Sequence, residues 1–189
     1  MFKPEQAHRS TFSIVISMLE LIYHSIVRSV RKSHKNAFSA IATNILQAVI
    51  FVGAFYVMFS ILGLRGAAVR GDFLIYIMTG IFLYMTHSKA LGAVVGSEGP
   101  ASPMMQHAPM NTIISICSAA FGALYIQVLS LVIILFVYHV AFTPLEIDQP
   151  VGAFAMLVLA WFTGAALGFV LLAIKPWFPT AVGIFSTIY

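Results

Sequence analysis

The chain has 189 residues, of which 60% are hydrophobic and only 8% carry charged side chains. A water-soluble domain typically has about a quarter of its residues charged, so the composition excludes an ordinary soluble fold and indicates an integral membrane protein. The net charge of +4 does not indicate nucleic acid as a partner, because most basic residues crowd near the N-terminus, ahead of the first long apolar stretch.

Residues 1–36 are expected to form a cytoplasmic tail followed by an amphipathic helix. Between residues 12 and 35, polar and basic residues recur every three or four positions, which is helical spacing, and the opposite side is apolar. Such a helix can lie in the membrane interface, with its basic side toward the lipid headgroups. The alternative is a single bent helix that continues into the first span. The basic cluster that would attract cytoplasmic-leaflet lipids is Arg28, Arg31, Lys32 and Lys35.

Residues 37–189 are expected to form a transmembrane helical domain. A bilayer core about 30 Å thick takes roughly 20 apolar residues per helical span. The stretches that are long enough and almost free of charge are 37–64, 73–95, 112–142 and 151–174. The last apolar run, 177–189, is too short to cross. The predicted fold class is therefore an all-α polytopic membrane helix bundle, with four spans and an incomplete fifth.

The short last run also predicts that the chain is a truncated form of a larger protein. A re-entrant or surface segment is the alternative. The basic residues set the expected orientation, because short basic flanks stay in the cytoplasm. The N-terminus is then inside, 63–72 and 143–150 are outside turns, and 96–111 is a cytoplasmic loop. Lys175 agrees with this orientation, whereas two arginines in the first outside turn oppose it.

The loop 96–111 reads GSEGPASPMMQHAPMN and is the longest expected cytoplasmic connection. Ser102 can cap a short helix that begins with Pro103, and its methionines would offer an adaptable contact to a partner protein. The alternative is an ordinary loop whose methionines dip into the interface. The candidate docking residues are Ser102, Pro103, Met104, Met105, Gln106 and His107.

Polar side chains inside the spans have structural interpretations that we prefer. Lys89 falls near the cytoplasmic boundary of the second span, where its ammonium can snorkel to headgroups; facing a polar path is the alternative. Asn44 and Gln127 are of the kind that joins helices by hydrogen bonds. Two Gly-x-x-x-Gly motifs, at 92–96 and 164–168, allow close helix approach.

Aromatic residues are frequent in the first two spans. Aromatic rings stack on sugars, but they also pack in cores and interface belts, and packing is the interpretation we prefer. The candidates for facing a glycan are Phe55, Tyr56, Phe59, Tyr76 and Tyr84. The sequence has no motif for ATP binding, for a serine nucleophile or for a hydrolytic metal site. We therefore expect no enzyme activity, no cofactor and no metal.

The layout as a whole resembles the membrane subunit, or permease, of ABC-2 type exporters for capsular polysaccharide and O-antigen. The segments that carry the resemblance are the basic helix ending RSVRKSHKNAF, the first span NILQAVIFVGAFYVMFSILG and the block EGPASPMMQHAPMNTIISICSAA. The resemblance covers essentially the whole chain. Compared with that family, the chain lacks the C-terminal third, and it has Lys175-Pro176-Trp177 where an Arg-Asp pair usually enters the fifth span.

The resemblance implies a location, a function and partners. The chain would be the permease subunit of an ATP-driven exporter of lipid-linked polysaccharide in the bacterial inner membrane. It would form a homodimer on two ATP-binding subunits, and movement would reach it through the loop 102–111. Arg28, Arg31 and Lys35 would meet the lipid phosphate, which the planar fork of arginine suits. The alternative, from another class, is a structural subunit without transport activity that packs into a larger membrane complex.

Overall fold

The computed structural model describes residues 20–21, 23–24, 37–63, 72–97, 112–142, 144–145 and 147–189. These residues form α2 (Ala37–Ile61), α3 (Phe73–Val95), α5 (Thr112–Ala141), α6 (Pro150–Ile174) and α7 (Pro179–Ile188), and no strand occurs among them. The predicted all-α fold class is confirmed. The helices α2, α3, α5 and α6 begin and end within a few residues of the four predicted spans, and α7 falls in the last apolar run.

Three helices of the described part of the chain are long and apolar enough to cross a membrane: α2 from Phe38, α5 and α6. α3 is of similar length at 23 residues, but it is not one of these three, because polar residues interrupt its second half. In the most apolar part of α2, only 11% is buried within the chain, and the corresponding share is 22% in α5 and in α6. Apolar surfaces of this extent mark contact with lipid or with other proteins, as expected of a membrane protein.

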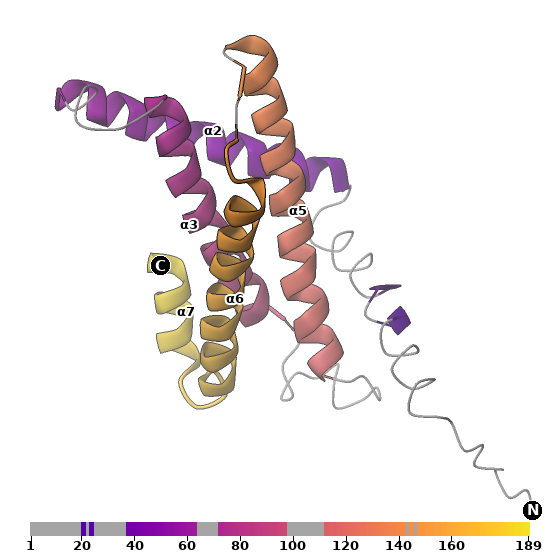
Figure 1. Ribbon diagram of the computed structural model, residues 1–189. Coiled ribbons are helices and arrows are strands. Elements are labelled where there is room, and N and C mark those ends of the chain that lie inside the picture. The colour runs from indigo at the N-terminus through magenta and orange to yellow at the C-terminus, as the bar shows by residue number, and fades with distance from the viewer. Residues whose placement is uncertain are drawn as a thin grey trace, which may run out of the picture.

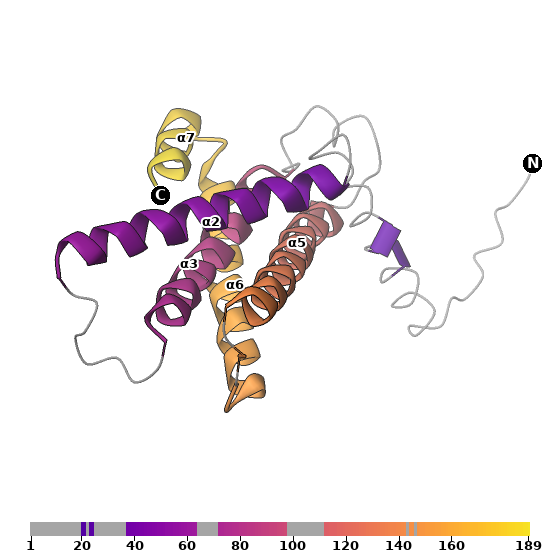
Figure 2. The same cartoon turned by 90° about the horizontal axis from the view of Figure 1, so that it is seen from above.

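α3 lies at the centre of the arrangement and contacts each of the other four helices. Figure 1 shows α3, α5 and α6 side by side, with α5 running opposite to the other two. α2 does not run alongside them. It lies crosswise over α3 and α5, as the view from above in Figure 2 also shows. The short α7 turns back beside α6 and α3.

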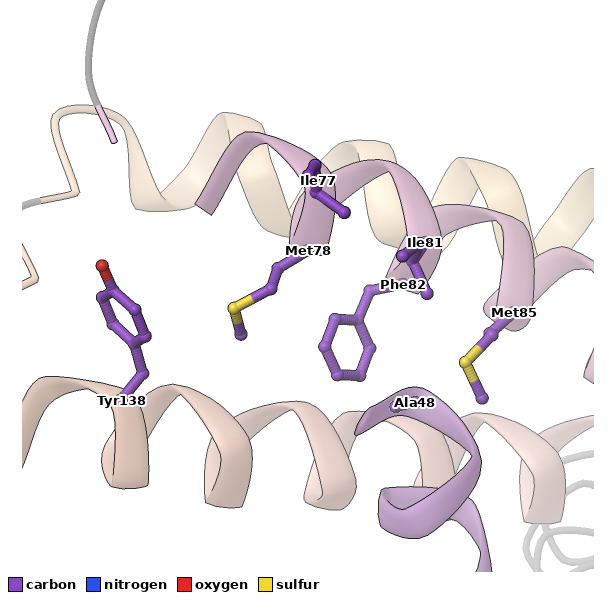
Figure 3. Close-up of a cluster of buried hydrophobic side chains, with 7 residues drawn as sticks. All are labelled: Ala48, Ile77, Met78, Ile81, Phe82, Met85 and Tyr138. Carbon is purple, nitrogen blue, oxygen red and sulfur yellow. The ribbon is translucent and has the colours of Figure 1, made fainter. Parts of the chain in front are cut away.

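The first half of α3 packs against α2 and α5. One core cluster combines residues of α3 with Ala48 of α2 and Tyr138 of α5, as Figure 3 shows. Its members from α3 recur at helical spacing and are Ile77, Met78, Ile81, Phe82 and Met85. Asp72 fixes the start of this helix: its carboxylate accepts the Leu74 N–H at 2.9 Å and also the hydroxyl of Tyr138. The N-terminus of α3 is therefore tied to α5.

The second half of α3 packs against α6 with the two backbones close together. A Cβ added to Gly164 would overlap the carbonyl of His87, and one added to Gly168 would lie 2.9 Å from the carbonyl oxygen of Leu91. The Gly-x-x-x-Gly motif at 164–168 therefore joins two helices of the same chain. The motif at 92–96 does not act in this way here, because a Cβ on Gly92 would meet nothing within 4 Å.

Candidate functional site

Polar side chains gather where α2 crosses α3 and α5. We call this group the polar junction. It consists of Asn44, Gln47, Lys89, Gln127 and Ser130. Polar groups among apolar helices often mark a functional site, because their burial in lipid or in a dry core costs free energy.

Two hydrogen bonds of the polar junction hold α2 to its neighbours. The side-chain amide of Asn44 donates from Nδ2 to Gln127 Oε1 at 3.0 Å. The ammonium of Lys89 donates to Gln47 Oε1 at 2.6 Å. Asn44 and Gln47 are three residues apart, so they lie on one side of α2, and one reaches α5 while the other reaches α3.

Small residues flank this contact on α2. Ala40, Asn44 and Ala48 are buried, and each is four residues from the next. They form a narrow stripe on one face of the helix. The rest of α2 is largely exposed, including Phe38 and Ile61 near its two ends. The crossing of α2 over α3 and α5 thus combines these small and polar residues with larger side chains of α2 that pack on the core cluster, namely Phe51, Val52, Tyr56 and Phe59.

The polar junction has hydrogen-bonding capacity left over. Gln127 is 1% exposed and Ser130 is 0% exposed, and neither Gln127 Nε2 nor Ser130 Oγ has a hydrogen-bond partner within the described residues. A buried polar group without a partner costs about 1–3 kcal/mol. Such groups are usually satisfied by internal water. Gln127 Nε2 and Ser130 Oγ are therefore the buried atoms of the polar junction whose hydrogen-bonding capacity is unused among the described residues.

Among the described residues of the polar junction, only Lys89 is charged, and its hydrogen-bond partner is the neutral amide of Gln47. The carboxylates of Asp72 and Asp148 stand just before α3 and α6. Lys89 lies 17 residues after Asp72 in the sequence, roughly 25 Å along the helix at 1.5 Å per residue. Neither carboxylate is placed to neutralise the ammonium.

A second polar contact lies between α3, α6 and α7. His87 pairs through Nδ1 with the hydroxyl of Thr163 at 3.0 Å and through Nε2 with that of Tyr189 at 2.7 Å. The hydroxyl of Tyr84 donates to the main-chain oxygen of Tyr189 at 2.6 Å. Both ring nitrogens of His87 are thus occupied by protein groups, which suits a structural role.

Charges separate along the helices. The ammonium of Lys175, just after α6, donates to the carbonyl of Val95 at the end of α3, at 2.9 Å. Lys89 lies in the second half of α3, whereas two of the described acids, Asp72 and Asp148, precede α3 and α6. Because α3 and α6 run in the same direction (Figure 1), lysines stand toward one end of the bundle and these carboxylates toward the other.

The predicted docking and lipid-binding residues are outside the part of the chain that the structure describes. These residues are Ser102, Pro103, Met104, Met105, Gln106, His107, Arg28, Arg31, Lys32 and Lys35. Their predicted roles stay predictions.

The predicted aromatic residues do not form one continuous surface. The rings of Tyr56 and Phe59 lie 6.4 and 5.7 Å from that of Phe73, next to the core cluster, and Phe55 contacts Phe59 at 6.4 Å. On α3, the side chains of Tyr76 and Tyr84 are 57% and 51% exposed. Packing accounts for Tyr56 and Phe59, whereas Phe55 is exposed. Of the two exposed tyrosines, Tyr84 uses its hydroxyl in the bond to Tyr189.

Sequence reasoning identified Asn44, Lys89 and Gln127 but missed Gln47 and Ser130. The available signal was helical spacing, since each missed residue lies three positions after an identified one on the same helix. Their importance depends on the crossing of α2, which a sequence pattern does not contain. Within the described residues no group of three or more His, Cys, Asp or Glu side chains could hold a metal ion.

Comparisons with known protein families, with curated proteins and with solved structures find no match to this chain. What the fold defines is therefore a class: an all-helical protein in which α2, α5 and α6 are able to cross a membrane.

Proposed function

We propose that this protein is the membrane permease subunit of an ATP-driven exporter of lipid-linked polysaccharide. In this proposal the chain binds and conducts its cargo as a homodimer, and a separate ATP-binding subunit hydrolyses ATP. The sequence resemblance suggests the proposal, and the order and length of α2, α3, α5 and α6 are compatible with it, whereas the crosswise course of α2 over α3 and α5 (Figure 2) departs from four spans side by side.

One observation carries the proposal: the end of α3 and the start of α5 lie at the same end of the bundle as the end of α6 (Figure 1). Lys175 stands at this end and holds the last turn of α3 through Val95. Basic flanks favour the cytoplasmic side. The residues that join α3 to α5 would therefore face the cytoplasm, where an ATP-binding subunit can reach them.

The proposed topology has a cytoplasmic N-terminus, an interfacial helix and four spans in the bacterial inner membrane. α3 is the proposed span whose polar side chains need hydrogen-bond partners within the protein, because it contains four polar residues in succession, Thr86, His87, Ser88 and Lys89. Thr86 and Ser88 donate to main-chain carbonyls of their own helix at 2.7 and 2.9 Å. His87 and Lys89 bond to neighbouring helices. With these hydrogen bonds made, the charge of Lys89 is the feature of this segment that still lacks a counter-charge among the described residues, and α3 can stand in lipid among α2, α5 and α6.

The docking test uses a tagged chain expressed in its native membrane and purified in mild detergent. We expect an ATP-binding subunit, recognised by its phosphate-binding loop sequence in mass spectrometry, to co-purify with the wild-type chain. Met104→Glu with Met105→Glu should abolish its recovery, because charges would disrupt the methionine contact. The matched control is Gln149→Glu, an exposed position before α6 on the proposed outer side.

Two results would contradict the proposal. Recovery of the ATP-binding subunit that is unaffected by the double substitution would exclude this docking site. Recovery of other integral membrane subunits, with no ATP-binding protein among them, would favour a structural subunit of a larger complex. The exposed apolar sides of α2, α5 and α6 would also suit that role.

A further inference from the structure

We infer that Lys89 and Gln47 form a binding site for a phosphate oxyanion, supplied by the headgroup of an anionic membrane lipid. This inference depends on the bundle lying in a membrane and not on polysaccharide export. The argument combines the charge of Lys89, the donors around it and its position on α3.

The first step is the charge. The described contact of the ammonium is with the neutral Gln47 amide at 2.6 Å, and Asp72 and Asp148 stand before the starts of α3 and α6. A cation in a low-dielectric setting is costly without a counter-charge. An anion that binds from outside the protein would supply that counter-charge.

The second step is the set of donors. An ammonium offers three N–H donors, and a glutamine amide offers two more. Gln47 Oε1 accepts one donor of Lys89. The remaining ammonium donors and the neighbouring Gln47 Nε2 can be shared by one oxyanion, and charge-assisted hydrogen bonds of this kind are the strong ones. Both side chains are only half-buried, so a ligand can approach them from the surface of the bundle.

The third step is the position along α3. Lys89 lies six residues before Val95, the last residue of the helix, which is about 9 Å of helix. The phosphate groups of a lipid leaflet lie just beyond the hydrocarbon core, within reach of a lysine side chain that snorkels. Both ring nitrogens of the nearby His87 are occupied by Thr163 and Tyr189, and Lys175 donates to the main-chain carbonyl of Val95, so neither group repeats the pairing of an ammonium with a side-chain amide.

The test measures lipid retention by the full chain. The protein is reconstituted in nanodiscs of phosphatidylcholine containing a minor share of phosphatidylglycerol, and bound lipids are counted by native mass spectrometry. We expect preferential retention of phosphatidylglycerol, which falls about fivefold in Lys89→Gln, the loss expected for one basic group near the membrane surface. Lys89→Arg should keep it.

Gln47→Glu is the more specific variant, because it keeps the lysine. The new carboxylate would neutralise the ammonium from within the protein, so we again expect a fivefold loss of phosphatidylglycerol. Lys175→Gln is the matched control and should retain the lipid as the wild type does. Helical content by circular dichroism shows that each variant is folded.

Retention that is unchanged in both Lys89→Gln and Gln47→Glu would overturn the inference. Competition by inorganic phosphate at millimolar concentration would instead assign the site to a free anion and overturn the lipid source. The measurement contains no ATP-binding subunit, so its failure and a failure of the export proposal can be told apart.

Discussion

α3 contacts α6 and α2 in two different ways. Against α6, glycines remove the side chains that would separate the helices, so that Gly164 and Gly168 lie directly on the backbone of α3. Against α2, the contact combines the rings of Tyr56 and Phe59 packed on Phe73, Ala48 in the core cluster, and the hydrogen bond between Gln47 and Lys89.

The difference shows two solutions to one problem. In an apolar solvent, helices gain little from hydrophobic burial, so they associate through close packing or through interhelical hydrogen bonds. α6 uses close packing of backbones over several turns of α3. α2 instead combines apolar and aromatic side chains along the first half of α3 with one polar contact at Lys89. We therefore expect α6 to be fixed by shape, and α2 to depend on a few groups that can be exchanged individually.

The largest effect is expected from Gly164→Val. The new side chain would collide with the carbonyl of His87, and neither backbone can yield without separating α3 from α6. We expect a loss of about 3 kcal/mol in the free energy of unfolding, at the upper end for overpacking, measured by denaturant titration in detergent. Gly80→Val is the control, because a Cβ there meets nothing within 4 Å; an equal loss in both variants would contradict the steric account.

Ala48→Leu tests whether size also matters where α2 crosses. Ala48 is fully buried against the core cluster of α3 and α5. A larger side chain would push α2 away, at a cost of about 2 kcal/mol. The same denaturant titration measures it, with Val49→Leu on an exposed position of α2 as the control. A stable Ala48→Leu variant would mean that α2 is free to shift over its neighbours.

A double-mutant cycle isolates the polar contribution at the crossing. Asn44→Leu and Gln127→Leu each leave the partner amide buried without its hydrogen bond. We expect each single variant to be destabilised and the double variant to recover part of the loss. The coupling energy should be about 1 kcal/mol, as for interhelical hydrogen bonds in membrane proteins. A coupling energy of zero would show that the two amides do not act together.

The smallest effect is expected from Thr163→Val, which removes the hydroxyl that pairs with His87 between α3 and α6. Valine has nearly the same shape, so the close packing at Gly164 is kept. We expect a loss of about 0.5 kcal/mol in the same titration, smaller than the coupling at Asn44. A larger loss would show that α6 also depends on polar contacts, and would remove the contrast between the two interfaces.

The sequence predicts the helices well and their contacts poorly. Apolar runs bounded by turn residues locate α2, α3, α5 and α6 because helix length in a membrane protein follows bilayer thickness. The two Gly-x-x-x-Gly motifs look alike in the sequence, yet only Gly164 and Gly168 lie against the backbone of another helix. Which motif is used depends on the surface opposite to it, and that surface comes from a distant part of the chain.

The candidate site shows the same limit. Asn44, Gln127 and Lys89 are conspicuous in the sequence as polar residues within apolar stretches. Their pairing across 83 residues, for Asn44 with Gln127, or across 42 residues, for Lys89 with Gln47, depends on how α2 crosses the bundle. Periodicity within one helix carries no information about that crossing angle.

During synthesis, α3 is made well before the residues that hold its second half. Lys175, which holds the end of this helix at Val95, is made 80 residues later, a delay of roughly 4–16 s at 5–20 residues per second on the ribosome. During that interval α3 has neither Gly164 and Gly168 of α6 packed against it nor the ammonium of Lys175 as a hydrogen-bond donor to the carbonyl of Val95. A ribosome-bound chain that stops before α6 should therefore contain an α3 that lacks both of these contacts.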